Sequence, residues 1–226
     1  MKQLVVEKNN PEPILWETPV PKPGPGEVLI KNHYSVVSTV TETATIESAN
    51  KSVAKKIQNS SNIEKGLELL EKEGVRAVWN AVFPKNILPI QLGYSSCGKV
   101  VEIGEGVKNF HVGDMVVSNG NHAEYVVVNQ NLCSRIPSET NDKEAAYTVL
   151  GSIALHGLRL SETSLGSRIV VVGLGIVGQL VCRLGEAQGS EVFGIDPDEL
   201  RRGDNKNYFA SINDLPIDEV DSVIIT

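Results

Sequence analysis

Residues 169–196 read IVVVGLGIVGQLVCRLGEAQGSEVFGID and decide the fold of this 226-residue chain. The stretch opens with four β-branched residues, Ile169 to Val172, which is typical of a strand covered on both faces of a sheet. A glycine turn, a helical segment and a second strand at 191–195 follow, and Asp196 ends that strand. This order predicts a βαβ unit that binds a nucleotide.

The three turn glycines, Gly173, Gly175 and Gly178, have the G-x-G-x-x-G spacing. In this motif the first glycine permits the tight turn, the second lets a pyrophosphate approach the backbone, and the third lets the helix pack closely on the strand. The same spacing also occurs where a turn merely packs a helix on a sheet, but the strand, helix and terminal acid are all in place here. The predicted cofactor-binding segment is Gly173, Leu174, Gly175, Ile176, Val177 and Gly178.

Asp196 lies about twenty residues beyond the glycines, where the motif places the acid that binds the adenosine ribose. A carboxylate there accepts hydrogen bonds from the ribose hydroxyls and repels a 2′-phosphate. We therefore expect NAD(H) in preference to NADP(H). Arg201 and Arg202 follow closely and leave NADP(H) as an alternative, although such arginines are more often solvated charges on a short helix.

The composition is that of a globular protein without a polyanionic partner. The chain is 41% hydrophobic, its formal net charge is −7, and Lys and Arg do not cluster on any one segment. We therefore expect a small-molecule substrate, and neither nucleic acid nor an anionic membrane surface. The N-terminus lacks an apolar signal core, and no run approaches the roughly 20 apolar residues that span a bilayer, so we expect a cytoplasmic protein.

The three cysteines, Cys97, Cys133 and Cys182, are odd in number, far apart in sequence and surrounded by apolar residues. This pattern favours buried free thiols over a disulfide framework or a zinc cluster.

Hydrophobic periodicity changes twice along the chain. Residues 1–37 contain short β-like runs separated by a proline- and glycine-rich break, as in the first hairpins of a small barrel. Residues 43–83 have apolar side chains at helical spacing, with Asn62 as a candidate N-cap. Residues 142–160 are also expected to be helical, and His156 is expected to face the core from this segment.

Residues 93–117, GYSSCGKVVEIGEGVKNFHVGDMVV, followed by AEYVVV and VVVGLGIVG, resemble the medium-chain dehydrogenase/reductase superfamily. Residues 103–116 carry its V-G-x-G-V-x-x-F-x-x-G-D-x-V pattern, in which Asp114 is expected to bond nearby turn amides rather than to do chemistry. The resemblance implies an α/β protein: a GroES-like catalytic β-barrel domain at 1–160 with a helical insertion at about 43–85, and the N-terminal half of a Rossmann domain at 161–226.

Residues 38–42, STVTE, and the helical insertion after them resemble a narrower bacterial subgroup of threonine-dehydrogenase-like, bi-domain oxidoreductases. The first motif of that subgroup reads S-x-G-T-E. This chain departs from it because Val40 replaces the glycine.

The residues at the metal positions of the superfamily differ from those of its zinc-dependent members. Those members bind catalytic zinc through a cysteine in the early loop, a G-H-E segment, and a cysteine or acid before the Rossmann domain. Here the corresponding residues are Ser38, Tyr94, Ser95 and Leu150, which do not supply thiolate, imidazole or carboxylate donors. Only residues 119–121 stand where the lobe that binds structural zinc would be inserted. We therefore predict no bound zinc.

Without a Lewis acid, hydride transfer to a carbonyl needs a proton donor or a hydrogen-bonding electrophile. Tyr94 is the first candidate, because its position faces the cleft in the resembled family; a tyrosine packed beneath the nicotinamide is about as common. His122 is the second, since imidazole exchanges protons near neutral pH, although a lone histidine is more often structural. Thr41 and Glu42 either orient a substrate hydroxyl, relay a proton or cap a helix.

Residues 221–226 are expected to form the fourth Rossmann strand, after which the chain ends with half of a nucleotide domain. To explain the half domain, we favour a fragment of a longer enzyme. The alternatives are a natural truncation and a half that another chain completes, as in a homo-oligomer. The predicted function is zinc-independent, NAD(P)-dependent hydride transfer between nicotinamide and an alcohol or carbonyl, with a sugar-like substrate implied by the subgroup. The alternative is a non-catalytic nucleotide-binding or interaction module.

Overall fold

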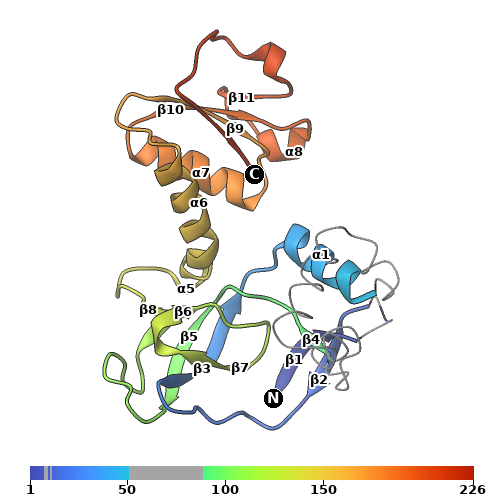
Figure 1. Cartoon of the computed structure of the whole chain (residues 1–226), viewed down its shortest axis with the longest axis vertical. Helices are drawn as coiled ribbons and strands as arrows, with labels where there is room; N and C mark the ends of the chain where they lie inside the picture. Colours follow the sequence, from blue (N-terminus) through green and yellow to red (C-terminus); the bar gives the residue numbers. More distant parts are fainter. Residues whose placement is uncertain (8–9, 11, 51–88) are drawn as a thin grey trace, which may run out of the picture. The chain divides into compact units, whose positions relative to one another are not determined.

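The computed structural model describes residues 1–7, 10, 12–50 and 89–226 (Figure 1). These residues form two compact units, Met1–Arg135 and Ile136–Thr226. Most of the predicted helical insertion, including the candidate cap Asn62, lies outside the described residues. Its beginning is described and is helical, as α1 (Thr39–Asn50). The assignment of residues 1–160 to a catalytic domain remains a prediction.

The first unit contains a five-stranded antiparallel sheet in the order β7-β3-β5-β6-β8, in which the long strand β3 pairs with β5 on one side and β7 on the other. Its core is made of β-branched side chains and one phenylalanine, as the alternating pattern of the sequence predicts. A second sheet of three strands has the order β2-β1-β4. The strands are β1 (Lys2–Val6), β2 (Ile14–Glu17), β3 (Glu27–Ser35), β4 (Ile90–Gln91), β5 (Ser96–Ile103), β6 (Met115–Ser118), β7 (Tyr125–Asn129) and β8 (Cys133–Arg135).

Asp114 has the structural role predicted for it. Its Oδ2 atom accepts hydrogen bonds from the His111 amide at 2.9 Å and from Arg135 Nε at 3.0 Å. The His111 amide, followed by the Arg135 guanidinium, holds the pKa of the Asp114 carboxyl below its ordinary value. The carboxylate therefore fastens the turn before β6 to the end of β8.

The second unit is a parallel sheet in the order β11-β10-β9-β12. Numbered along the chain, this is the 3-2-1-4 order of the first part of a Rossmann sheet, and the predicted βαβ unit is confirmed as β9, α7 and β10. The strands are β9 (Arg168–Val172), β10 (Glu191–Ile195), β11 (Tyr208–Phe209) and β12 (Ser222–Ile225); the helices are α5 (Asp142–Ala145), α6 (Thr148–Leu160), α7 (Ile176–Ala187) and α8 (Glu199–Arg202). The predicted α/β fold class is confirmed.

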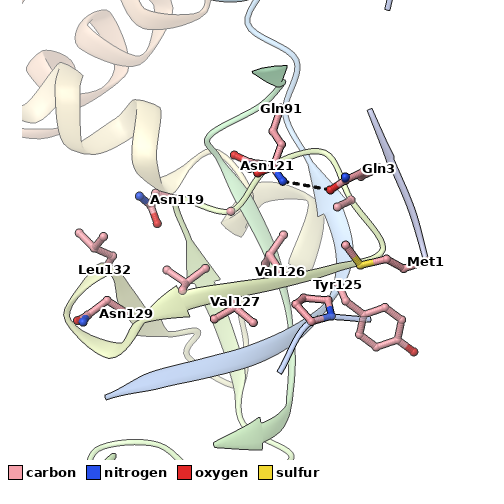
Figure 2. Close-up of a pocket in the computed structure, with 14 residues that line it drawn as sticks. Met1, Gln3, Gln91, Asn119, Asn121, Tyr125, Val126, Val127, Asn129 and Leu132 are labelled. Atoms are coloured by element: carbon pink, nitrogen blue, oxygen red, sulfur yellow. Dashed lines mark hydrogen bonds between the residues drawn. The ribbon is translucent and has the colours of Figure 1, made fainter. Parts of the chain in front are cut away.

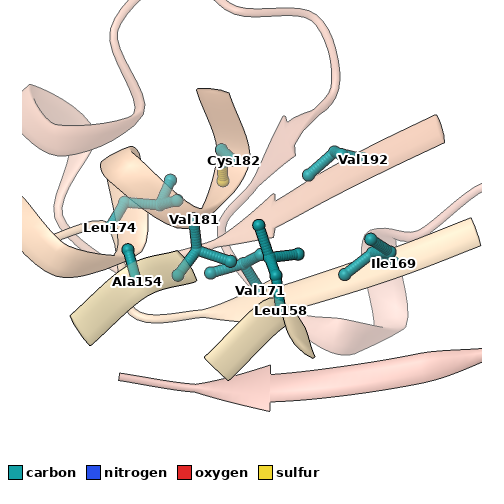
Figure 3. Packing of buried hydrophobic residues seen from close by; sticks show 8 residues of the cluster. All are labelled: Ala154, Leu158, Ile169, Val171, Leu174, Val181, Cys182 and Val192. Carbon is teal, nitrogen blue, oxygen red and sulfur yellow. The ribbon is translucent and has the colours of Figure 1, made fainter. Parts of the chain in front are cut away.

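One face of the parallel sheet is covered by α6 and α7 (Figure 3). The shared core consists of Ala154, Leu158, Ile169, Val171, Leu174, Val181, Cys182 and Val192. Burial raises the pKa of the Cys182 thiol to about 11. The prediction for His156 is wrong: its side chain is exposed, because the apolar face of α6 passes through Ala154 and Leu158.

All three cysteines lie in the described part of the chain, and none forms a disulfide there. Cys97 and Cys182 are buried, as predicted, whereas Cys133 is only half-buried. Among the described residues, no helix combines the length and the apolar character needed to cross a bilayer.

Candidate active and cofactor sites

In the first unit, the side chains of Ser35 and Glu42 both bond to His122, which lies far from them in the sequence. His122 Nε2 lies 3.0 Å from Glu42 Oε1, and His122 Nδ1 lies 2.8 Å from Ser35 Oγ. His122 and Glu42 are 9% and 7% exposed, whereas Ser35 is exposed. Opposite an ionised carboxylate, which can only accept, Nε2 would carry the proton, and Nδ1 of the neutral ring would accept from the Ser35 hydroxyl.

The backbone of His122 is held between segments of the small sheet. The Leu4 amide donates to the His122 carbonyl at 2.8 Å, and the His122 amide donates to the Leu92 carbonyl at 2.8 Å. From the large sheet, Asn32 Nδ2 donates to the carbonyls of Asn121 at 3.2 Å and Ala123 at 2.9 Å, on either side of the histidine. The backbone that carries the imidazole is therefore held by hydrogen bonds to both sheets.

Glu42 lies in the first turn of α1 and has two partners. Its Oε1 atom accepts the Ser38 amide at 2.9 Å as well as His122 Nε2. The first of these bonds satisfies an amide at the start of the helix, as in a capping box. Glu42 therefore caps the helix, which was one of the alternatives that the sequence left open, and it contacts His122 at the same time.

Tyr94 and Thr41 form a separate pair. Tyr94 is half-buried in the turn between β4 and β5, and its hydroxyl lies 3.4 Å from Thr41 Oγ1. Because Thr41 and Glu42 are adjacent, the first turn of α1 contacts both Tyr94 and His122. The structure thus places all four candidate catalytic residues around one helical turn.

Gly93 is needed where it stands because His122 packs against it. Its φ of +87° is rare for residues with a side chain, and a Cβ atom there would lie 2.7 Å from His122 Cγ and Nδ1. No side chain other than hydrogen fits between this backbone and the ring.

The residues at the superfamily's zinc positions lack the donor atoms that a zinc site needs. Ser38, Ser95 and Leu150 are buried, and hydroxyl and isobutyl groups do not replace thiolate or imidazole. In the described part of the chain, no three His, Cys, Asp or Glu side chains gather closely enough to hold a metal ion. The absence of zinc stays a prediction.

A surface pocket of about 390 Å³ lies beside β7 and β1 (Figure 2). Carboxamides dominate its polar lining: Asn121 donates to Gln91, and Gln91 Nε2 donates to Gln3 Oε1 at 3.2 Å. The pocket has no acidic or basic side chain in its lining, and the candidate catalytic residues are not part of it. It is therefore distinct from the candidate active site.

The glycine turn of the second unit has the geometry that its motif predicts. Gly173 has a φ of +95°, and a Cβ on Gly178 would lie 1.8 Å from the Gly173 carbonyl oxygen. A Cβ on Gly175 would meet nothing within 4 Å, and no side chain caps the first turn of α7 there. The turn is therefore closed on its protein side at Gly178 and open at Gly175, where an anion can reach the helix amides.

Asp196 is 3% exposed and bonds to the glycine turn. Its Oδ2 atom accepts the Leu174 amide at 2.8 Å and Arg201 Nη1 at 3.3 Å, and its Oδ1 atom accepts the Asp198 amide at 2.9 Å. Burial alone raises the pKa of this carboxyl, but the two amides and the guanidinium outweigh burial and hold the pKa below its ordinary value. Arg202 donates instead to the carbonyls of Asp196 and Pro197, at 2.7 and 2.8 Å.

The sequence did not indicate Ser35, Asn32 or Gly93. Ser35 and His122 are 87 residues apart, and a serine at the end of a strand carries no spacing signal. Gly93 was part of the quoted family segment, but its contact with His122 depends on the pairing of strands.

We expect Gly93→Ala to lower the free energy of unfolding by more than about 1 kcal/mol, because it adds backbone strain and displaces the His122 ring. Denaturant unfolding measures this loss. Gly106→Ala is the matched control, since Gly106 has a φ of +78° and open space around its Cβ position. Equal losses in both variants would mean that the contact with His122 contributes nothing.

We expect Asp196→Asn to destabilise the second unit by about 1–3 kcal/mol at neutral pH, since it removes a charged acceptor of three hydrogen bonds. The folded-state pKa of Asp196 is lowered, so its stabilising effect is full above the unfolded pKa of about 4 and is lost as the pH falls through the folded value. Unfolding at several pH values should show the difference from wild type shrinking in acid. Asp204→Asn, at an exposed site, should match wild type throughout.

Comparison with known proteins matches residues 70–138 to the alcohol dehydrogenase GroES-like domain. The chain is 28% identical over 136 residues to (R,R)-butanediol dehydrogenase of Bacillus subtilis, covering 48% of this chain and 39% of that protein. It is 34% identical over 111 residues to D-guloside 3-dehydrogenase of Escherichia coli, covering 47% and 32%. The structure of a quinone oxidoreductase from Coxiella burnetii superposes with a TM-score of 0.74 and 23% identity, covering 99% of this chain and 68% of that one.

These comparisons support the medium-chain dehydrogenase/reductase superfamily. The superfamily fold agrees with the GroES-like and Rossmann-like sheets of the two units. The chain spans less than half the length of the two dehydrogenases to which it was aligned.

Proposed function

We propose that this chain is the GroES-like part and the adenosine-binding part of a zinc-independent oxidoreductase that moves hydride between a nicotinamide and an alcohol or carbonyl substrate. The observation that carries the proposal is the glycine turn between β9 and α7. It is closed where the helix meets the strand and open over Gly175, which is the shape that a pyrophosphate requires.

The residues of the second unit fit a dinucleotide. Residues 173–178 would hold the pyrophosphate against the helix amides, and Asp196 would bind the ribose, since each carboxylate oxygen can accept more than one hydrogen bond. When bound, the nicotinamide supplies or accepts the hydride. NAD is the proposed cofactor because Asp196 disfavours a 2′-phosphate; Arg201 is engaged with that same carboxylate.

The proposed catalytic residues are Tyr94, His122, Thr41 and Glu42. Hydride transfer to or from an alcohol also moves a proton, and the residues at the zinc positions cannot supply a metal ligand set. The protein must therefore exchange the proton through its own side chains. Tyr94 with Thr41, and His122 with Glu42, are the pairs around the first turn of α1 that can do so.

The proposed substrate is polyhydroxylated and sugar-like, as in the threonine-dehydrogenase-like, bi-domain subgroup that residues 38–42 resemble. The names of two aligned relatives, butanediol dehydrogenase and D-guloside 3-dehydrogenase, support a hydroxylated carbon as the site of oxidation. Such a substrate would be neutral and would require hydrogen-bonding side chains near the reacting carbon.

Calorimetric titration with NADH, NADPH and ADP-ribose tests the nucleotide site. We expect saturable binding that prefers NADH, and we expect Gly175→Val to abolish it while leaving unfolding unchanged, because a Cβ atom at this position meets no other atom within 4 Å in the free protein. Gly178→Ala should instead lower stability, since its Cβ overlaps the Gly173 carbonyl oxygen. Wild-type protein that binds none of the three ligands would contradict the cofactor assignment.

Hydride transfer itself is tested with the full-length protein, a panel of polyols and ketoses, and absorbance of the reduced cofactor. We expect turnover, and we expect Tyr94→Phe or His122→Gln to lower kcat by about 100-fold or more if the residue exchanges the proton. Binding without turnover across the panel would favour the alternative, a nucleotide-binding module without catalysis. Turnover unaffected by both substitutions would refute the residue assignment.

A further inference from the structure

We propose that the Ser35 hydroxyl is the outward end of a proton path formed by Glu42, His122 and Ser35, and that it exchanges the proton with the substrate. This inference rests on the proposed hydride transfer. In this path His122 does not exchange a proton with the substrate directly, but passes it between Ser35 and its own Nδ1 atom while Glu42 holds Nε2.

The hydrogen bonds of the imidazole show why His122 does not meet the substrate itself. Both of its ring nitrogens are already engaged, Nε2 with Glu42 at 3.0 Å and Nδ1 with Ser35 at 2.8 Å. The ring is 9% exposed and is fixed by its backbone bonds and by Gly93. A substrate could reach either nitrogen only by replacing one of these partners.

Ser35 is the most exposed of the three residues. It ends β3 and is exposed to solvent, while Glu42 and His122 are buried. A hydroxyl both donates and accepts, so Ser35 can accept a proton from outside while it donates its own to Nδ1. This is the property that a relay group needs.

The proton balance of alcohol oxidation follows from these contacts. In alcohol oxidation, a bound nicotinamide would supply the acceptor for the hydride of the carbinol carbon. The substrate O–H proton would pass to Ser35 Oγ, and the Ser35 proton would pass to His122 Nδ1. The carbonyl product would then leave an imidazolium whose Nε2–H remains bonded to Glu42. Carbonyl reduction runs the same transfers backwards, and the imidazolium then returns the proton through Ser35.

Glu42 supports the path through its contact with the buried ring. Its Oε1 atom lies 3.0 Å from His122 Nε2, where an ionised carboxylate accepts a hydrogen bond and has no proton of its own to donate. Glu42 is therefore a positioning residue: it keeps the proton on Nε2 and so leaves the Nδ1 lone pair directed at Ser35.

The first test measures the histidine tautomer by ¹⁵N NMR of this chain, without substrate or cofactor. For the neutral ring of His122 we expect a protonated Nε2 and an unprotonated Nδ1 that accepts a hydrogen bond. Ser35→Ala should shift the Nδ1 resonance towards that of a nitrogen without a hydrogen bond, whereas Ser134→Ala, at an exposed strand serine, should not. A neutral ring protonated at Nδ1 would overturn the proposal, because Ser35 could not then donate to it.

The second test uses the turnover of the full-length protein. Ser35→Ala should lower kcat by about 100-fold or more with little change in KM, and Ser35→Thr, which keeps the hydroxyl, should restore most of it. Glu42→Gln should lower kcat in the wild type and add little in the Ser35→Ala background, as expected for groups that act as one unit. An active wild type with an unimpaired Ser35→Ala variant refutes the path alone, whereas a wild type that shows no turnover refutes the proposed function.

Discussion

The hydrogen bonds to residues 121–123 join the two sheets of the first unit, and the candidate active site depends on them. β1 and Leu92 bond to the backbone of His122, while Asn32 on β3 bonds to the carbonyls on either side. Because neighbours from both sheets hold this short segment, the imidazole has little freedom to turn. The contact with Gly93 removes what freedom is left. Positioning of the histidine is therefore a property of the fold, achieved before any ligand binds.

The second unit could be predicted well from sequence because its determinants are local. A buried strand, three glycines and an acid lie within 28 residues, and each has a separate steric or electrostatic reason to be there. The structure adds what the motif does not contain: the Asp196 carboxylate bonds to the Leu174 amide, so the acid secures the turn as well as ending the strand. This bond joins positions 22 residues apart and could be inferred only once the strand order was known.

The candidate active site was predictable only in part, since its members come from three separate segments. Tyr94, Thr41, Glu42 and His122 could be singled out by residue type and by family position. Their pairing could not, because it depends on how α1 begins beside the turn before β5. Ser35 carried no signal at all: a serine at the end of a strand gains its significance only from the imidazole 2.8 Å away. The prediction that His156 faces the core was wrong because even an apolar helix has one face that is exposed to water.

The double use of Asp196 bears on attempts to redesign cofactor choice. Exchanging the acid at the end of the second strand for a small neutral residue is the direct way to admit a 2′-phosphate, because it removes the repelling charge. In this protein the same exchange would leave the Leu174 and Asp198 amides without their acceptor. Cofactor selectivity and the rigidity of the glycine turn thus both depend on the Asp196 side chain. A redesign that removes this carboxylate would have to introduce a new acceptor for those amides.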